Sequence, residues 1–216
     1  MKYSHLWLSL LLLLVSLSPA LAANSLGAEI LAIRDAWDHA NYELTGDARE
    51  KALAKVAREA RALADQHPDR PEALAWKGIA LATWAGAKGG LGALSLAKEA
   101  RDTLLAAEQI DPKVLNGSIY TTLGSLYYRV PGWPIGFGDD DKARTYFRRA
   151  LALNPDGLDP NYFYGDFLLE QGEYEKAVKV LERALHAPPR PDRAVADQGR
   201  RRQVQAALRK AREHTS

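Results

Sequence analysis

The sequence of 216 residues contains no cysteine and only one methionine. Without cysteine the chain cannot form a disulfide, and it cannot carry the lipid anchor that lipoproteins attach to a cysteine. Thiolate nucleophiles and thiolate zinc sites are excluded for the same reason. The fold must therefore be held together by packing and by polar contacts among the other side chains.

An excess of charge of one sign is also missing. The chain has 29 Lys and Arg residues against 27 Asp and Glu residues, which gives a formal net charge of +2. Such a nearly neutral chain lacks the broad positive field that attracts nucleic acid. No nucleic-acid partner is predicted.

Strand patterns are scarce along the chain. Alanine and leucine dominate, β-branched residues are few, and alternation of apolar and polar residues never lasts beyond a few positions. Apolar residues recur instead at helical spacing, which predicts an all-α protein.

Long apolar runs are confined to the N-terminus. Lys2 precedes an apolar run over residues 6–17, and residues 20–22 read Ala-Leu-Ala, the small-x-small pattern of a signal peptidase site. This arrangement predicts a secretory signal over residues 1–22 that is cleaved after Ala22. The mature protein is then periplasmic or secreted. The alternative is an uncleaved anchor helix.

Reactive constellations are missing as well. His39, His67, His186 and His214 show no HExxH spacing, and the chain has no GxSxG motif. The glycine-rich segment 86–92 is preceded by a helical pattern and followed by no GK[ST], so it is not a phosphate loop. We predict no enzymatic activity, no metal site and no cofactor.

Prolines mark an internal repeat. Pro68, Pro112, Pro155 and Pro189 each follow an amphipathic segment, and they lie 44, 43 and 34 residues apart. A proline blocks the continuation of a helix, so each one ends a helical unit. The spacing predicts a repeat of 34 residues that is lengthened in two of its units.

Small and large residues recur at fixed offsets within the units. Counting Leu158 as position 1, Gly165 is at position 8, Ala177 at 20, Leu181 at 24 and Ala184 at 27. Small residues let two helices approach closely, and the large residue fills the space between them. The same offsets are occupied in the two preceding units, once an insertion is removed from each, by Gly124, Ala143, Phe147 and Ala150 and by Gly78, Ala100, Leu104 and Ala107.

These offsets resemble the tetratricopeptide repeat family over nearly all of the mature chain. The resemblance implies a right-handed α-solenoid of about four helix pairs plus a C-terminal capping helix. We expect a degenerate helical pair in residues 23–70, repeats with long loop insertions in residues 71–191, and the capping helix in residues 192–216. The signal and the inserted loops are also similar to the exported tetratricopeptide T-components of TRAP-type transporters, which implies work beside a solute-binding subunit.

The two insertions differ in composition. Residues 86–92 predict a flexible connection between the helices of one pair. Residues 131–138 combine prolines and glycines with Trp133 and Phe137, and Asp139 then predicts an N-cap for the next helix. Either the two aromatic rings pack back onto the helices, or they are presented as a binding surface.

The first helix of each pair faces the concave groove in such arrays, and we predict that this groove binds a peptide or a protein partner. The candidate binding residues are Ile79, Tyr128, Arg129, Tyr162 and Asp166 in the groove, with Trp133 and Phe137 on the loop. The alternative is a carrier for a small apolar ligand. Its pocket would be closed by the inserted loops and lined by Trp76, Trp84, Tyr128, Trp133, Phe137 and Tyr162.

The C-terminal helix is rich in basic residues. Its basic residues are Arg200, Arg201, Arg202, Arg209, Lys210 and Arg212. A capping helix needs a polar outer face, so we interpret this stretch as a solvated face. Contact with a membrane is not predicted.

Overall fold

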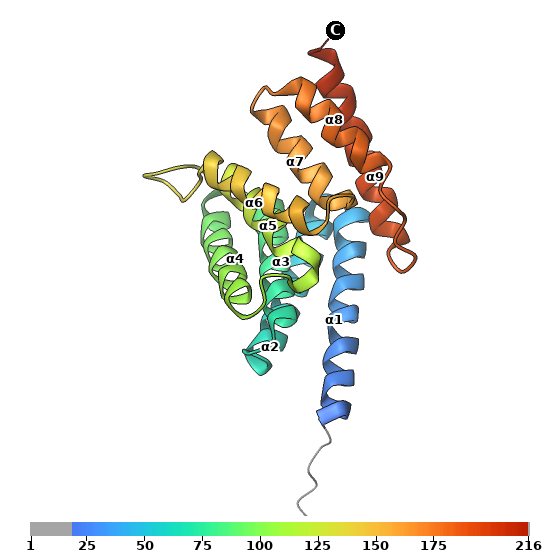
Figure 1. Cartoon of the computed structure of the whole chain (residues 1–216). Helices are drawn as coiled ribbons and strands as arrows, with labels where there is room; N and C mark the ends of the chain where they lie inside the picture. Colours follow the sequence, from blue (N-terminus) through green and yellow to red (C-terminus); the bar gives the residue numbers. More distant parts are fainter. Residues whose placement is uncertain (1–18, 216) are drawn as a thin grey trace, which may run out of the picture.

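The computed structural model describes residues 19–215, and the apolar run of the predicted signal lies outside this part. The described chain is all-α (Figure 1). Its elements are α1 (Pro19–Tyr42), α2 (Gly46–Gln66), α3 (Pro71–Lys88), α4 (Gly90–Ile110), a 3₁₀ turn η1 (Val114–Gly117), α5 (Ser118–Arg129), α6 (Asp140–Leu153), α7 (Leu158–Glu170), α8 (Tyr174–Leu185) and α9 (Ala194–Glu213). Within residues 19–215 no helix is both long and apolar enough to cross a membrane.

The predicted packing within the helix pairs is confirmed. Three glycines lie against large side chains of the partner helix: Gly78 against Leu104, Gly124 against Phe147, and Gly165 against Leu181. A Cβ atom at these glycines would come within 2.5, 2.8 and 2.6 Å of the facing side chain. Only glycine fits there, because the backbone of one helix lies directly against a large side chain of its partner helix and leaves no room for a Cβ atom.

The side chains that fill these contacts are fully buried. Phe147 and Leu181 each expose 0% of their surface, as do Ala143 and Ala177 beside them. Burying one such large apolar side chain stabilises the fold by about 1.5–3 kcal/mol. The α-helical pairs therefore gain most of their stability from the residues that the repeat offsets single out.

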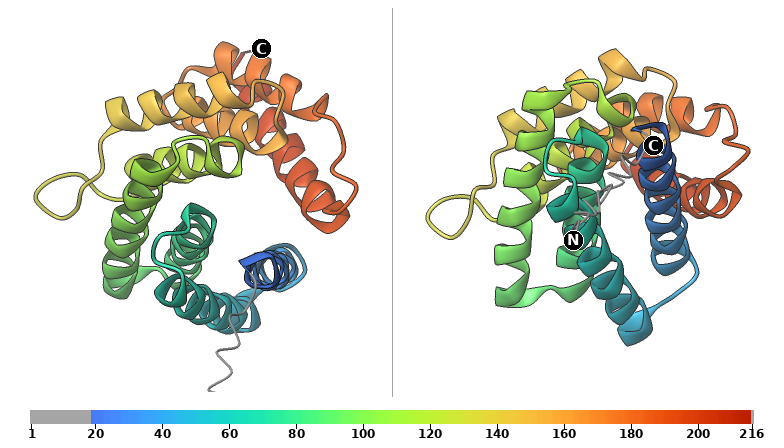
Figure 2. Two further views of the ribbon diagram at one scale, coloured as in Figure 1. Left: turned by 60° about the horizontal axis from the view of Figure 1, so that its bottom comes forward. Right: turned by 90° about the horizontal axis from the view of Figure 1, so that it is seen from below.

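The odd-numbered helices form a closed circuit. Helix α1 packs on α3, α3 on α5, α5 on α7, and α7 on α9, and α9 in turn packs on α1. Figure 2 shows the chain curving round so that its red C-terminal helix comes back to its blue N-terminal helix. The predicted stack of helix pairs with a capping helix is confirmed. In addition its two ends are joined, a contact that the sequence did not predict.

Arginine side chains join the two ends. Arg193, at the start of α9, donates two hydrogen bonds to the carboxylate of Asp38 on α1, and both side chains are largely buried. Close packing adds to this contact, because Gly199 of α9 lies against the ring of Tyr42. Burial raises the pKa of the Tyr42 hydroxyl to about 12, so this ring stays neutral at physiological pH.

The interpretation of the whole basic stretch of α9 as a solvated face is wrong for Arg200. This residue exposes only 5% of its surface. Its Nε donates to Asp159 at 2.7 Å, and its guanidinium lies 4.4 Å from the ring centroid of Phe163. The reason is the docking of α9 on both α7 and α1, which encloses this side of the helix.

The predicted flexible connection over residues 86–92 is also wrong. Helix α3 continues to Lys88 and α4 begins at Gly90, so nearly all of the insertion lengthens the two helices. Gly89 and Gly90 both have a φ of +62°, a left-handed conformation that glycine adopts without steric cost. Two glycines are therefore enough to reverse the chain.

Candidate functional site

Three predicted binding residues from two neighbouring helix pairs meet at one point. The Tyr128 hydroxyl of α5 and the Arg129 guanidinium of α5 both donate to the carboxylate of Asp166 on α7. The side chain of Arg129 remains 56% exposed while that of Asp166 is only 15% exposed. We call these three residues, together with Tyr162, the inner cluster.

The local structure fixes Tyr128 in a neutral, donating state. Its ring packs against Phe147 and Phe167, with ring centroids 6.0 and 5.6 Å apart. Burial raises the pKa of the Tyr128 hydroxyl, and the neighbouring negative charge of Asp166 raises it further. The Arg129 guanidinium lies 4.8 Å from the centre of the Tyr128 ring, so the exposed charge sits on an aromatic platform.

Tyr162 belongs to the same cluster through its charged neighbours. Burial raises the pKa of its hydroxyl, and the carboxylate of Asp166 raises it as well. Its ring lies 4.6 Å from the guanidinium of Arg200, on the side that faces α9. The inner cluster is thereby coupled to the junction that closes the circuit of helices.

The two aromatic residues of the α5–α6 loop behave differently. Trp133 is 90% exposed and Ile135 is 67% exposed, so both project into solvent. Phe137 instead packs edge-on against Tyr127 and lies beneath the guanidinium of Arg101, 4.4 Å away. Phe137 thus packs back onto the helices, as the first interpretation predicts. Trp133 does not, and its use as a binding surface stays a prediction.

The loop between α5 and α6 projects away from the helices (Figure 1), and hydrogen bonds of its own backbone close its base. The Gly132 carbonyl accepts from the N–H groups of Ile135 and Gly136, and the Pro131 carbonyl accepts from Gly138 at 3.0 Å. A Cβ atom at Gly138 would come within 1.9 Å of a backbone oxygen, so this position requires glycine. The exposed tip is therefore carried by an ordered base.

Asp139 caps the helix that follows the loop, as predicted. Its Oδ1 accepts a hydrogen bond from the backbone N–H of Lys142 at 3.0 Å. This backbone hydrogen bond lowers the pKa of the Asp139 carboxyl. Asp140 and Asp141 follow in the first turn and are exposed. Their negative charges interact favourably with the positive N-terminal end of the helix dipole.

An open hollow lies between the inner cluster and the base of the loop. It has a volume of about 390 Å³. Its walls are formed by Tyr127, Tyr128, Arg129, Val130, Pro131, Gly132, Gly138, Asp139 and Asp140. Both charges and apolar atoms line it, which suits an extended peptide better than a purely apolar ligand.

The remaining predicted residues do not gather at this hollow. Ile79 lies on α3, half-buried against the apolar core. The six rings proposed for an apolar pocket are dispersed, because Trp76 packs edge-on against Trp37, Trp84 lies near the charges of Arg61 and Lys88, and Trp133 points into solvent. Tyr128 and Tyr162 lie together in the inner cluster, but the other rings do not join them, so the predicted arrangement of that pocket is wrong.

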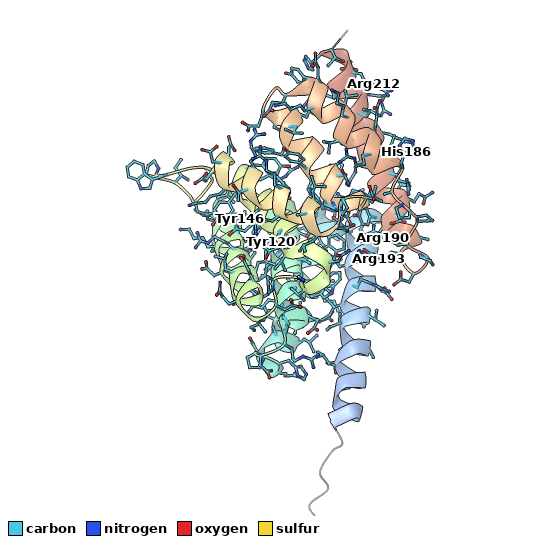
Figure 3. The ribbon with its side chains drawn as sticks, in the orientation of Figure 1. Tyr120, Tyr146, His186, Arg190, Arg193 and Arg212 are labelled. Carbon is cyan, nitrogen blue, oxygen red and sulfur yellow. The ribbon has the colours of Figure 1, made fainter. Side chains whose placement is uncertain are left out.

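The repeat pattern did not reveal the arginine residues at the helix junction. Arg190 and Arg193 lie beside the start of α9 and next to α1 (Figure 3). Arg190 donates to Asp159 at 2.7 Å and to Asp197 at 2.6 Å. The sequence does show that Arg and Asp residues are frequent between α8 and α9. No periodicity, however, connects these residues with their partners on α1 and α7.

Metal ligands do not cluster in the described part of the chain. Among residues 19–215 no three His, Asp or Glu side chains are placed so that they could hold a metal ion. His214 stacks on the ring of Tyr174, with centroids 4.3 Å apart, and His186 caps the end of α8. The contacts of these two histidines are therefore a ring stack and the end of a helix.

Family and fold comparisons agree with this architecture. The tetratricopeptide repeat family model matches residues 135–208, which run from the α5–α6 loop into α9. Residues 135–208 are therefore similar to tetratricopeptide repeats, and the described chain as a whole has the fold of a tetratricopeptide solenoid. No curated protein sequence matches the chain.

A solved structure extends the likeness over most of the chain. The crystal structure of TTC0263, described as a thermophilic TPR protein of Thermus thermophilus, has a TM-score of 0.55 at 18% identity. That match covers 87% of this chain and 94% of the other. A crystal structure of MamA has a TM-score of 0.46 at 20% identity and covers 76% of this chain and 90% of the other. At these identities the likeness concerns the fold alone.

Proposed function

We propose that this chain is an exported interaction module that binds an extended segment of a protein partner. The observation that carries the proposal is the convergence of Tyr128 and Arg129 of one repeat with Asp166 of the next, beside the hollow at the loop base. The exposed Arg129 guanidinium offers unused donors for a carboxylate or a backbone carbonyl, while the tyrosine rings offer contact area. The dispersed rings give no support to a carrier for a small apolar ligand.

Site-specific photo-crosslinking in living cells tests this function. A photoreactive amino acid replaces Arg129 in one variant and Arg148 in a matched control, because Arg148 is an exposed arginine of α6 that is not a member of the inner cluster. We expect a covalent adduct with a discrete protein from position 129 and none from position 148. Equal adducts at both positions, or a folded protein without adducts at position 129, would contradict the proposal.

Arg129 is a better position than Tyr128 for this experiment. Replacing Tyr128 would remove ring contacts with Phe147 and Phe167 and could weaken the fold as well as binding. Export is tested separately by the mass of the protein recovered outside the cytoplasm, which should begin at Ala23. A role beside a solute-binding subunit of a transporter stays a prediction of the family resemblance, and the identity of the cross-linked partner decides it.

A further inference from the structure

A second surface hollow lies at the far end of the α5–α6 helix pair. It has a volume of about 250 Å³ and is lined by Pro112, Lys113, Tyr120, Arg149, Ala152 and Leu153. These residues come from the turn after α4, the first turn of α5 and the last turns of α6. The hollow is smaller than the pockets that take drug-sized ligands, and it suits a single side chain.

Aromatic rings connect this hollow to the projecting loop. Tyr120 stacks on Tyr146, Tyr146 stacks on Tyr127, and Tyr127 meets Phe137 edge-on, with successive centroids 6.1, 5.5 and 5.5 Å apart. Figure 3 shows Tyr120 and Tyr146 side by side on this pair of helices. Such a continuous column of rings holds the loop and the hollow at a fixed distance from each other.

The tip of the loop and the hollow have complementary chemistry. The tip presents Trp133 and Ile135, and the exposed carboxylates of Asp140 and Asp141 follow its base. The hollow is lined by the apolar side chain of Leu153 and by the cationic side chains of Lys113 and Arg149. Arg149 lies 4.1 Å over the Tyr120 ring and already forms an ion pair with the carboxylate of Glu108. The ammonium of Lys113 forms no ion pair in the described part of the chain, so it is the cation of the hollow that remains open to a partner.

The tip cannot reach the hollow of its own molecule. Helices α5 and α6 have 12 and 14 residues, which places the two ends of the pair about 20 Å apart. The hydrogen-bonded base of the loop prevents it from folding back over that distance. Only a second molecule can bring a tip to the hollow.

We infer that the Trp133 tip of one copy of this chain inserts into the Tyr120–Arg149 hollow of another copy. The indole ring of Trp133 fills the hollow, and Asp140 and Asp141 face Lys113 of the neighbouring copy. Because tip and hollow lie at opposite ends of one helix pair, the contact is head-to-tail and leaves a free tip and a free hollow at the two ends of each assembly. A contact built on one loop is small, so association is weak and depends on concentration.

Sedimentation velocity of the purified full chain over a wide concentration range tests the inference. The average mass of the wild type should rise beyond that of a dimer as concentration increases. Trp133→Ala and Ala152→Glu should both stay monomeric, because the first lacks the tip and the second places a negative charge in the hollow. Both positions are exposed, so circular dichroism and the melting temperature should match those of the wild type.

Mixing the two variants gives the decisive result. Trp133→Ala retains a hollow and Ala152→Glu retains a tip, so an equimolar mixture should form a complex that stops at one copy of each. Val195→Ala removes another exposed apolar side chain and should associate like the wild type. A monomeric wild type at every concentration, association of either single variant, or a mixture that fails to pair would overturn the inference.

Discussion

The contacts inside the helix pairs and the junction of α1 with α9 stabilise the same array by different chemistry. Inside the pairs, Gly124 and Gly165 admit the large apolar side chains of Phe147 and Leu181. At the junction, arginine residues of the last helix and its preceding turn bind carboxylates of α1 and α7. The first kind of contact is insensitive to pH and salt, whereas the second depends on both.

The difference follows from how often each kind of contact occurs in the molecule. Every helix pair buries its apolar face in the same way, so another pair can be stacked on it through the same contacts. The α1–α9 junction occurs once and must hold the two ends in a single arrangement. Bidentate arginine–carboxylate pairs suit this purpose because they are directional, while apolar packing alone tolerates small shifts.

Adding a side chain within a helix pair should have the largest effect. Gly165→Val would place its Cβ 2.6 Å from Leu181, which has no free space to move into because it is fully buried. We expect the free energy of unfolding to fall by about 3 kcal/mol, measured by urea denaturation. The loss should be the same at neutral and acid pH, because no titrating group is involved.

A second glycine substitution controls for the change of residue type. Gly86 lies within α3, and a Cβ atom added there would meet no other atom within 4 Å, so Gly86→Ala should be neutral or stabilise by about 0.5 kcal/mol. A loss for Gly165→Val no larger than about 0.5 kcal/mol would contradict the importance of close packing at this contact.

Removing one charge at the junction should have a smaller, pH-dependent effect. Burial alone would raise the pKa of Asp159, but the positive charges of Arg200 and Arg190 hold it far below its ordinary value. Asp159 therefore stabilises the fold above about pH 4, and this stabilisation is lost as the pH falls. We expect Asp159→Asn to cost about 2–3 kcal/mol at neutral pH.

Urea denaturation at several pH values checks this sign. The difference between wild type and Asp159→Asn should shrink steadily below about pH 4, since protonation removes the same charge from the wild type. If the difference stayed constant down to about pH 2, the ion pairs of Asp159 would not contribute to stability.

The packing inside the pairs could be predicted from the sequence because it is local and repeated. Gly165 and Leu181 belong to one unit, and their offset recurs in other units. The pairing of Arg193 with Asp38 spans 155 residues and occurs once, so no period reveals it. Only the curvature of the whole array, summed over several pairs, brings these two residues together.

The candidate site could likewise be predicted where it depends on repeated positions, but not where it depends on a contact that occurs once. Tyr128, Arg129 and Asp166 occupy groove-facing positions of neighbouring units, and stacking the units brings them into contact. The opposite orientations of Trp133 and Phe137 could not be predicted from the loop sequence. Phe137 turns inward because it packs against Arg101 and Tyr127, and neither residue belongs to the loop.

The finest test of the junction keeps its charge and changes its geometry. Arg193→Lys retains a cation beside Asp38 but loses the second of two parallel hydrogen bonds. We expect about 1 kcal/mol of local destabilisation, seen as about fivefold faster amide hydrogen exchange in α1. Exchange in α5 and α6 should not change, because this pair is held by the apolar contact of Gly124 with Phe147. Arg148→Lys on the exposed side of α6 should leave α1 unaffected as well. Faster exchange throughout the array would mean instead that the junction and the helix pairs open together, and that the two regions form a single cooperative unit.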